Sequence, residues 1–282
     1  MPLAAFPKCF LDALSVDRTM TVEDWIVQAA DRLDIDGLDF YWGFTPHEDE
    51  AALARLRRLA ESRELAIPMM CYSPDFIQPD PQERRREIEA QKRAIEVTAL
   101  LGGKFCRVLS GQRREGVGRA EGIGMASESI QACLPHAQAH GITLVLENHF
   151  KDGYWQFPEF AQKQDVFLEL LASIPASPWF GVNFDPSNAI IAGDDPLALL
   201  EAVKHRVVSM HASDRFFAGG VLTHGVIGQG INDYNKIFSL LASVGFAGWV
   251  SIEDGQDPAV GMEHLQLSAQ FLRAKMTEHG LK

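Results

Sequence analysis

Short apolar runs alternate with longer amphipathic segments along the whole chain. The apolar runs predict eight β-strands, at residues 8–14, 36–41, 66–72, 104–110, 142–149, 180–184, 206–210 and 247–252. The segments between them repeat their apolar positions at helical spacing. They predict helices at residues 19–33, 47–64, 82–101, 125–139, 165–173, 196–204, 233–243 and 258–278. Each predicted strand is therefore followed by a predicted helix.

This order of elements predicts the fold class. Strands that alternate with helices form a parallel sheet with right-handed crossovers, and eight such units close into a (β/α)₈ TIM barrel. The predicted strands are nearly continuous in apolar residues, as expected for strands that are buried on both faces. We expect a single α/β domain over residues 1–282. A doubly wound open sheet is the competing fold, but no G-x-G-x-x-G stretch opens a helix after the first strand.

Composition narrows the class of protein without specifying its chemistry. The chain has 282 residues, is 46% hydrophobic and carries a formal net charge of -12 with a pI near 5.2. We expect no nucleic-acid partner, because nucleic-acid affinity depends on lysine and arginine contacts with phosphates. No stretch approaches the roughly 20 apolar residues of a membrane span, and the N-terminus lacks the apolar segment of a secretory signal. These features predict a cytoplasmic protein without a membrane partner. They do not decide whether the chain forms a homo-oligomer.

The cysteines give no sign of a structural framework. Cys9, Cys71, Cys106 and Cys133 form no C-x-x-C pair, and most of them lie in apolar runs. We therefore expect buried, reduced thiols rather than disulfide bonds.

The last four predicted strands each end in a side chain that can bind a metal. The runs LVLE, GVNFD, VVSMH and WVSIE end at Glu147, Asp185, His211 and Glu253. An unpaired carboxylate at the end of a buried strand is costly, so each acid needs a partner. In a TIM barrel the C-terminal ends of all strands meet at the rim where active sites lie. We therefore expect these four side chains to converge.

Three converging carboxylates need a counter-charge, because each one raises the pKa of the others. A divalent cation supplies that charge, and three oxygen donors with one imidazole favour Mn²⁺ or Mg²⁺, with Fe²⁺, Co²⁺ and Zn²⁺ as alternatives. Taken singly, each acid could be a loop cap or a surface ion pair, and His211 could be a hydrogen-bonded structural residue. Their joint position at four strand ends favours a metal site.

The segments LVLEN, GVNFDPSNA, VVSMHASD and WVSIED resemble the sugar phosphate isomerase/epimerase family of xylose isomerase-like TIM barrels, which includes ketose 3-epimerases and inosose dehydratase-like proteins. The resemblance covers essentially the whole chain. It implies that Glu147, Asp185, His211 and Glu253 bind the metal. It also implies that Glu147 and Glu253 are the catalytic pair, which exchanges protons on opposite faces of the substrate carbon. Gly228-Gln229-Gly230 is similar to the family's Gly-Glu-Gly turn, with glutamine in place of the acid.

The chain differs from the epimerases close to the metal ligands. Asn188 stands where they often have a histidine, and Arg215 is the nearest arginine after His211. His224 resembles an extra zinc ligand of endonuclease IV, a member of the same superfamily, but the other residues needed for three zinc ions are missing. We expect a substrate-binding set that consists of His149, Asn188, Asp214, Arg215 and His224. A structural role in a loop is an equal alternative for His149.

The predicted site supports a first chemical step that is shared by several reactions. A ketone oxygen bound to the metal acidifies the neighbouring C–H, and a glutamate removes that proton to give an enediolate. We predict a divalent-metal-dependent isomerase or epimerase of a ketose, sugar phosphate or related polyol. The alternative is a dehydratase of a cyclic keto-polyol or related acid, of inosose or dehydroshikimate type. A non-catalytic metal- or sugar-binding protein and an endonuclease are more distant alternatives.

Overall fold

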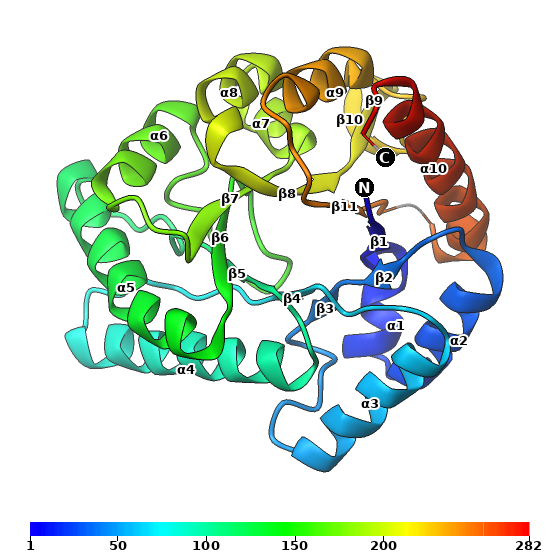
Figure 1. Ribbon diagram of the computed structural model, residues 1–282. Helices are drawn as coiled ribbons and strands as arrows, with labels where there is room; N and C mark the ends of the chain where they lie inside the picture. The colour runs from blue at the N-terminus through cyan, green and yellow to red at the C-terminus, as the bar shows by residue number, and fades with distance from the viewer. Residues whose placement is uncertain (256, 282) are drawn as a thin grey trace.

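Short parallel strands form a nearly closed ring at the centre of the molecule, and helices surround the ring (Figure 1). The computed structural model describes residues 1–255 and 257–281. In this part of the chain the ring contains nine strands: β1 (Leu3–Ala5), β2 (Gly37–Leu38), β3 (Phe40–Tyr41), β4 (Met69–Cys71), β5 (Phe105–Val108), β6 (Thr143–Glu147), β7 (Phe180–Phe184), β8 (Val207–Ala212) and β11 (Trp249–Ile252).

The strand order shows how the ring closes. It runs β2-β1-β11-β8-β7-β6-β5-β4-β3, and every pair is parallel. β2 and β3 are two halves of the second predicted strand, separated by Asp39, and they pair with β1 and β4 respectively. One interrupted strand therefore joins the two ends of the sheet. The fold is a single (β/α)₈ TIM barrel, as predicted.

The outer layer consists of the helices that follow the strands of the ring. They are α2 (Val22–Arg32), α3 (Glu50–Ser62), α4 (Pro81–Leu100), α5 (Arg119–His140), α6 (Gln164–Ser173), α8 (Pro196–Val203), α9 (Tyr234–Ser243) and α10 (Pro258–Glu278). Shorter helical segments are η1 (Lys8–Phe10), α1 (Leu11–Ser15), α7 (Pro186–Ala192) and η2 (Lys204–Arg206). None of the described helices combines the length and apolar character that a membrane span requires.

Local sequence explains where many of these helices begin. Four of them start at an Asp-Pro pair, in which the aspartate side chain accepts a backbone N–H of the first turn and proline occupies the first helical position. Thr21 caps α2 in a reciprocal capping box with Asp24. The four cysteines are all buried and free, as predicted.

The structure differs from the sequence-based expectation in three places. The first strand is Leu3–Ala5, not residues 8–14, which form η1 and most of α1. A run of three apolar residues is too short to show a repeat, so the longer amphipathic run beside it gave the stronger signal. The hairpin of β9 (Asp214–Ala218) and β10 (Val221–Gly225) was not predicted. The short helix α7 was not predicted.

Candidate active site

Three of the four predicted metal ligands meet at the C-terminal rim of the barrel. Glu147 ends β6, His211 lies in β8, and Glu253 directly follows β11. The Nδ1 atom of His211 lies 2.9 Å from Oε1 of Glu147 and 2.8 Å from Oε2 of Glu253. Glu147 and His211 are 0% exposed, and Glu253 is 6% exposed. Two carboxylate oxygens and one ring nitrogen therefore surround a single buried point.

Asp185 lies outside this three-residue cluster, between β7 and α7. Its Oδ1 atom accepts hydrogen bonds from two backbone N–H groups of α7 at 2.7 and 3.0 Å, and from the hydroxyl of Ser213 at 2.7 Å. The Asn148 side chain also pairs with the backbone N–H and C=O of Asp185, at 2.9 and 2.6 Å. Burial and the charges of Glu253 and Glu147 raise the pKa of Asp185 to about 6. A rigid carboxylate thus stands within electrostatic reach of both glutamates.

Two cations hold the outer oxygens of the two glutamates. Nη1 of Arg107, in β5, lies 2.9 Å from Oε2 of Glu147, and Nζ of Lys8 lies 2.5 Å from Oε1 of Glu253. Burial acts to raise the pKa of Glu147, but His211 and Arg107 outweigh it and lower the pKa to about 2. Burial also opposes ionisation of Glu253, yet Lys8 and His211 hold its pKa well below the ordinary value. Both glutamates are therefore ionised at neutral pH.

Arg107 and Lys8 were not among the predicted site residues. Arg107 interrupts the apolar run FCRV, and it is only 3% exposed. A charge inside a buried strand needs a partner, so the reasoning applied to Glu147 would have identified this arginine as well. Lys8 carries no comparable signal, because its position follows from the course of the chain after β1.

A further carboxylate lies on the other side of the His211 ring. The Nε2 atom of His211 lies 3.4 Å from Oδ2 of Asp39, the residue that separates β2 from β3. Burial acts to lower the pKa of His211, but Glu147 and Asp39 raise it well above the ordinary value. A carboxylate behind the ring is the usual second partner of a metal-binding histidine.

The spacing of the donors also fits a metal ion. Atoms that bind one ion in an octahedral arrangement at about 2.1 Å lie roughly 3 Å from one another. The carboxylate oxygens at 2.9 and 2.8 Å from Nδ1 of His211 match that separation. Oxygen-rich sites with one imidazole suit divalent cations such as Mn²⁺ and Mg²⁺. The residues present therefore fit a divalent cation beside Nδ1.

A cavity of about 340 Å³ opens beside the cluster, and most of the predicted substrate-binding residues line it. Its wall includes Glu253 and the two cations Lys8 and Arg107, so it reaches the reactive groups. Four of the five predicted substrate-binding residues line it, namely His149, Asn188, Arg215 and His224. The cavity can therefore bring a small polar molecule to Glu253 and to the cations that contact the two glutamates.

Arg215 and His224 face each other across the β9–β10 hairpin. Nη2 of Arg215 lies 3.0 Å from Nε2 of His224. Among the described residues, Nε of Arg215 and Nδ1 of His224 have no hydrogen-bond partner. Burial and the charge of Arg215 lower the pKa of His224 to about 4, so this ring is neutral at neutral pH. Unpaired buried polar atoms are costly, and a polar ligand in the cavity would satisfy them.

Asp214, the fifth predicted substrate-binding residue, is not part of the cavity wall. Its two carboxylate oxygens accept backbone N–H groups of Arg215, Gly228, Gly230 and Asn232, at 2.9, 2.9, 3.0 and 3.1 Å. A side chain at Gly230 would collide with this carboxylate, which explains the glycine in the Gly-Gln-Gly turn. The geometry therefore favours a structural role for Asp214 in place of the predicted contact with substrate.

Replacement of Asp214 by alanine is expected to loosen the turn at residues 226–232. Loss of an acceptor for four N–H groups should lower the free energy of unfolding by more than about 3 kcal/mol, since hydrogen bonds to charged groups contribute roughly 1.5–3 kcal/mol each. Urea unfolding and amide hydrogen exchange measure the two effects. Asp233→Ala, which removes the cap of α9 and an exposed ion pair with Lys236, is the matched control and should cost about 1 kcal/mol. Unchanged exchange at the turn would contradict the assigned role.

Comparison with known proteins places these observations in a family. A sequence model described as "Xylose isomerase-like TIM barrel" matches residues 27–275. An inosose dehydratase of Bacillus thuringiensis (strain Al Hakam) is 24% identical over 158 residues, which cover 49% of this chain and 50% of that protein. The chain thus spans about half the length of the curated relatives it matches.

Two solved structures share the fold over nearly all of their length. The IolI protein with a bound zinc atom superposes with a TM-score of 0.79 at 15% identity, covering 99% of each chain. The D-psicose 3-epimerase of Clostridium cellulolyticum H10 superposes with a TM-score of 0.79 at 14% identity, covering 98% of this chain and 99% of that one. At 15% and 14% identity, the similarity shows a shared fold.

Proposed function

The chain belongs to the xylose isomerase-like TIM barrel family, and from that premise we propose that it is a divalent-metal-dependent isomerase or epimerase of a ketose, sugar phosphate or related polyol. The observation that carries the proposal is the convergence of Glu147 and Glu253 on Nδ1 of His211, at 2.9 and 2.8 Å. Two ionised carboxylates at one buried point, beside a cavity that Glu253 lines, would provide two bases for a single substrate carbon.

The metal would be held by Glu147, His211 and Glu253, with Asp185 as the fourth ligand. When bound, a divalent ion would polarise a substrate carbonyl and acidify the neighbouring C–H. The donor set favours Mn²⁺ or Mg²⁺, and Co²⁺, Fe²⁺ or Zn²⁺ are compatible with it. The zinc atom bound by the IolI protein, which has the same fold, supports the use of a metal.

The two glutamates would carry the protons. One carboxylate removes the proton next to the carbonyl. The other must first be protonated before it can return a proton to the opposite face, and Lys8, 2.5 Å from Oε1 of Glu253, can supply that proton; the product is then an epimer. Return to the neighbouring carbon gives an isomer. Lys8 and Arg107 lie against the outer oxygens of these carboxylates, so they hold both carboxylates in place. Both cations also line the cavity, where positive charge favours the negative charge that develops on the substrate.

A dehydratase is the second candidate function, supported by the relatives that are named inosose dehydratase. Lys8 favours it too, because its ammonium group brings a proton donor to the Glu253 side of the cavity. Loss of a β-hydroxyl requires a proton for the departing oxygen. The first step, removal of the proton next to the carbonyl, would be the same.

Incubation with a panel of ketoses, sugar phosphates and cyclic keto-polyols in deuterium oxide tests the proposal. We expect one substrate to gain deuterium at the carbon next to the carbonyl and to yield an epimer or isomer, both detected by NMR. A conjugated enone absorbance would favour the dehydratase. Absence of exchange and of product across the panel, with metal bound, would contradict both functions.

Removal of the metal is expected to abolish turnover. Treatment with a chelator followed by dialysis should lower the rate by more than about 100-fold, because the ion is worth several kcal/mol of charge stabilisation. Addition of Mn²⁺ or Mg²⁺ should restore it, and plasma mass spectrometry should count the ion that returns. Full activity of a protein shown to be metal-free would overturn the metal dependence.

A further inference from the structure

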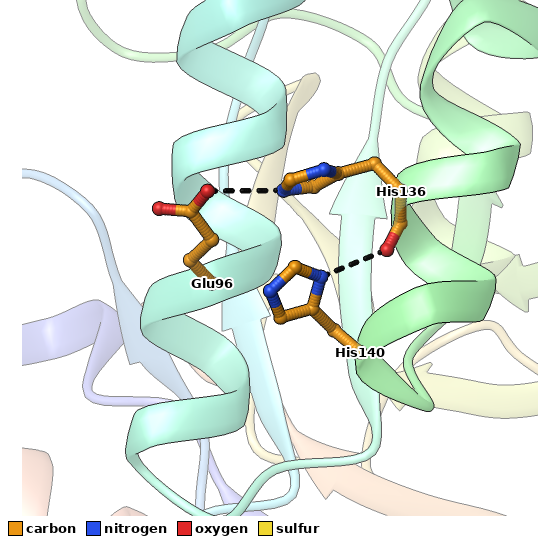
Figure 2. Close-up of side chains that lie close together, drawn as sticks. All are labelled: Glu96, His136 and His140. Carbon is orange, nitrogen blue, oxygen red and sulfur yellow. Dashed lines mark hydrogen bonds and ion pairs between the residues drawn. The ribbon is translucent and has the colours of Figure 1, made fainter.

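A second group of metal-binding side chains lies on the outside of the barrel, between α4 and α5 (Figure 2). Glu96 comes from α4, and His136 and His140 come from α5. Residues four apart on a helix project from the same face, and Figure 2 shows both imidazoles on the side of α5 that faces α4. The chain passes from the end of α5 into the N-terminal end of β6. The group therefore lies at the end of the barrel opposite to the candidate active site.

The three side chains are close enough for one ion to bind them all. One ligand atom from each residue lies within 4.8 Å of the others. Nε2 of His136 is 3.1 Å from Oε1 of Glu96, and the two imidazole centroids are 4.4 Å apart. Ligand atoms on a tetrahedral ion at about 2.0–2.1 Å are roughly 3.3 Å apart. Small side-chain rotations would therefore complete the site, and on this partly exposed surface such rotations are not resisted by tight packing.

The surroundings orient the ligands as they do in metal sites. Nδ1 of His140 lies 2.9 Å from the backbone oxygen of His136, and a ring N–H donated to this carbonyl leaves Nε2 of His140 as the metal-binding atom. Donation of the second ring N–H to a backbone carbonyl is the common arrangement of metal-binding histidines. Nη1 of Arg93 lies 2.9 Å from Oε2 of Glu96, which leaves Oε1 directed to the histidines.

The donors and their place in the helices define the class of ion. Two imidazoles and one carboxylate suit Zn²⁺ and its first-row neighbours, whereas Mg²⁺ and Ca²⁺ prefer oxygen donors. His140 is the last residue of α5, and Glu96 lies in the last turns of α4. The C-terminal end of a helix carries partial negative charge and favours a cation.

We propose that Glu96, His136 and His140 form a second site, for a transition-metal ion such as Zn²⁺, that clamps α4 to α5. The site has no direct part in the proposed reaction. It would stabilise the outer layer of the barrel, because an ion that binds the folded chain and not the unfolded chain raises the melting temperature. An exposed His140 leaves room for water at the remaining coordination position.

Zinc titration of the full-length, metal-free protein by calorimetry tests the proposal. The His211→Asn variant removes a ligand of the barrel site, and we expect it still to bind one Zn²⁺ and to melt at a higher temperature when Zn²⁺ is added. Addition of His136→Asn and His140→Asn should weaken zinc binding by more than about 100-fold. Loss of a residue that only hydrogen-bonds a metal ligand already lowers metal affinity roughly 10–100-fold. His205→Asn, an exposed histidine outside the cluster, is the matched control and should change nothing.

Two results would overturn the proposal. One is the absence of zinc binding in His211→Asn, and the other is zinc binding that survives loss of both surface histidines. Should His211→Asn fail to fold, anomalous scattering at the zinc edge from crystals of the unsubstituted protein decides the matter. A peak between α4 and α5 supports the site, and its absence at saturating Zn²⁺ rejects it. Failure of the barrel site would appear separately, as zinc binding in the unsubstituted protein that is lost entirely with His136→Asn and His140→Asn.

Discussion

Replacement of Glu253 by glutamine is expected to slow deuterium exchange at the substrate carbon by about 10²–10⁴-fold, the usual contribution of a positioned general base. Glutamine keeps the size of the side chain but cannot accept the proton. It also loses the charge that pairs with Lys8, 2.5 Å away. The rate of deuterium incorporation, followed by NMR with the substrate found in the panel, measures the effect.

The metal content of the same variant separates two roles of Glu253. Plasma mass spectrometry gives the occupancy, and the exchange rate is then compared per bound ion. Glu263→Gln, the same change on the exposed surface of α10, is the matched control and should exchange at the original rate. Undiminished exchange in Glu253→Gln would remove this residue from the proton-transfer step.

Replacement of Arg107 by methionine should lower the free energy of unfolding of the metal-free protein by about 3–5 kcal/mol, the cost of removing one partner of a buried ion pair. The guanidinium is 3% exposed. It donates to Glu147 at 2.9 Å, to the Ser73 hydroxyl at 2.8 Å and to the Tyr72 carbonyl at 3.3 Å. Its removal leaves the carboxylate of Glu147 buried without its nearest permanent cation. Denaturant unfolding, monitored by circular dichroism, gives the value.

The double variant Arg107→Met with Glu147→Gln tests the cause of that loss. If the cost comes from an unpaired buried charge, removal of the carboxylate as well should restore part of the stability, although it should not restore turnover. Arg85→Met, at an exposed position of α4, is the control for the substitution itself. Equal stability of Arg107→Met and Arg85→Met would contradict the account of this ion pair.

The fold could be predicted because most of its strands and helices carry their own signal in the sequence. Buried parallel strands are apolar without interruption, and amphipathic helices repeat at 3.6 residues. The polar residues that end the last four strands were visible for the same reason, since Glu147 and Glu253 stand out against apolar runs. Closure at Asp39 was not predictable, because it depends on β2 and β3 pairing with different neighbours.

The parts of the site that sequence did not predict depend on contacts between distant segments. Lys8 and Glu253 are 245 residues apart, and Arg107 and Glu147 are 40 apart. The spacing of neighbouring residues in the sequence gives no sign of such pairs. Asp214 shows the converse problem, because its place after the metal-ligand strand suggested a contact with substrate. Its carboxylate instead accepts backbone N–H groups of the turn at residues 226–232, among them that of Gly228, 14 residues later in the chain.

Anomalous scattering from crystals soaked in Mn²⁺ tests most directly whether the convergent side chains form a metal site. The account predicts a strong manganese peak in the barrel, in contact with Glu147 Oε1, His211 Nδ1 and Glu253 Oε2, with Asp185 completing the protein ligands. A barrel without a peak at saturating Mn²⁺, in crystals whose cluster is otherwise intact, would contradict it.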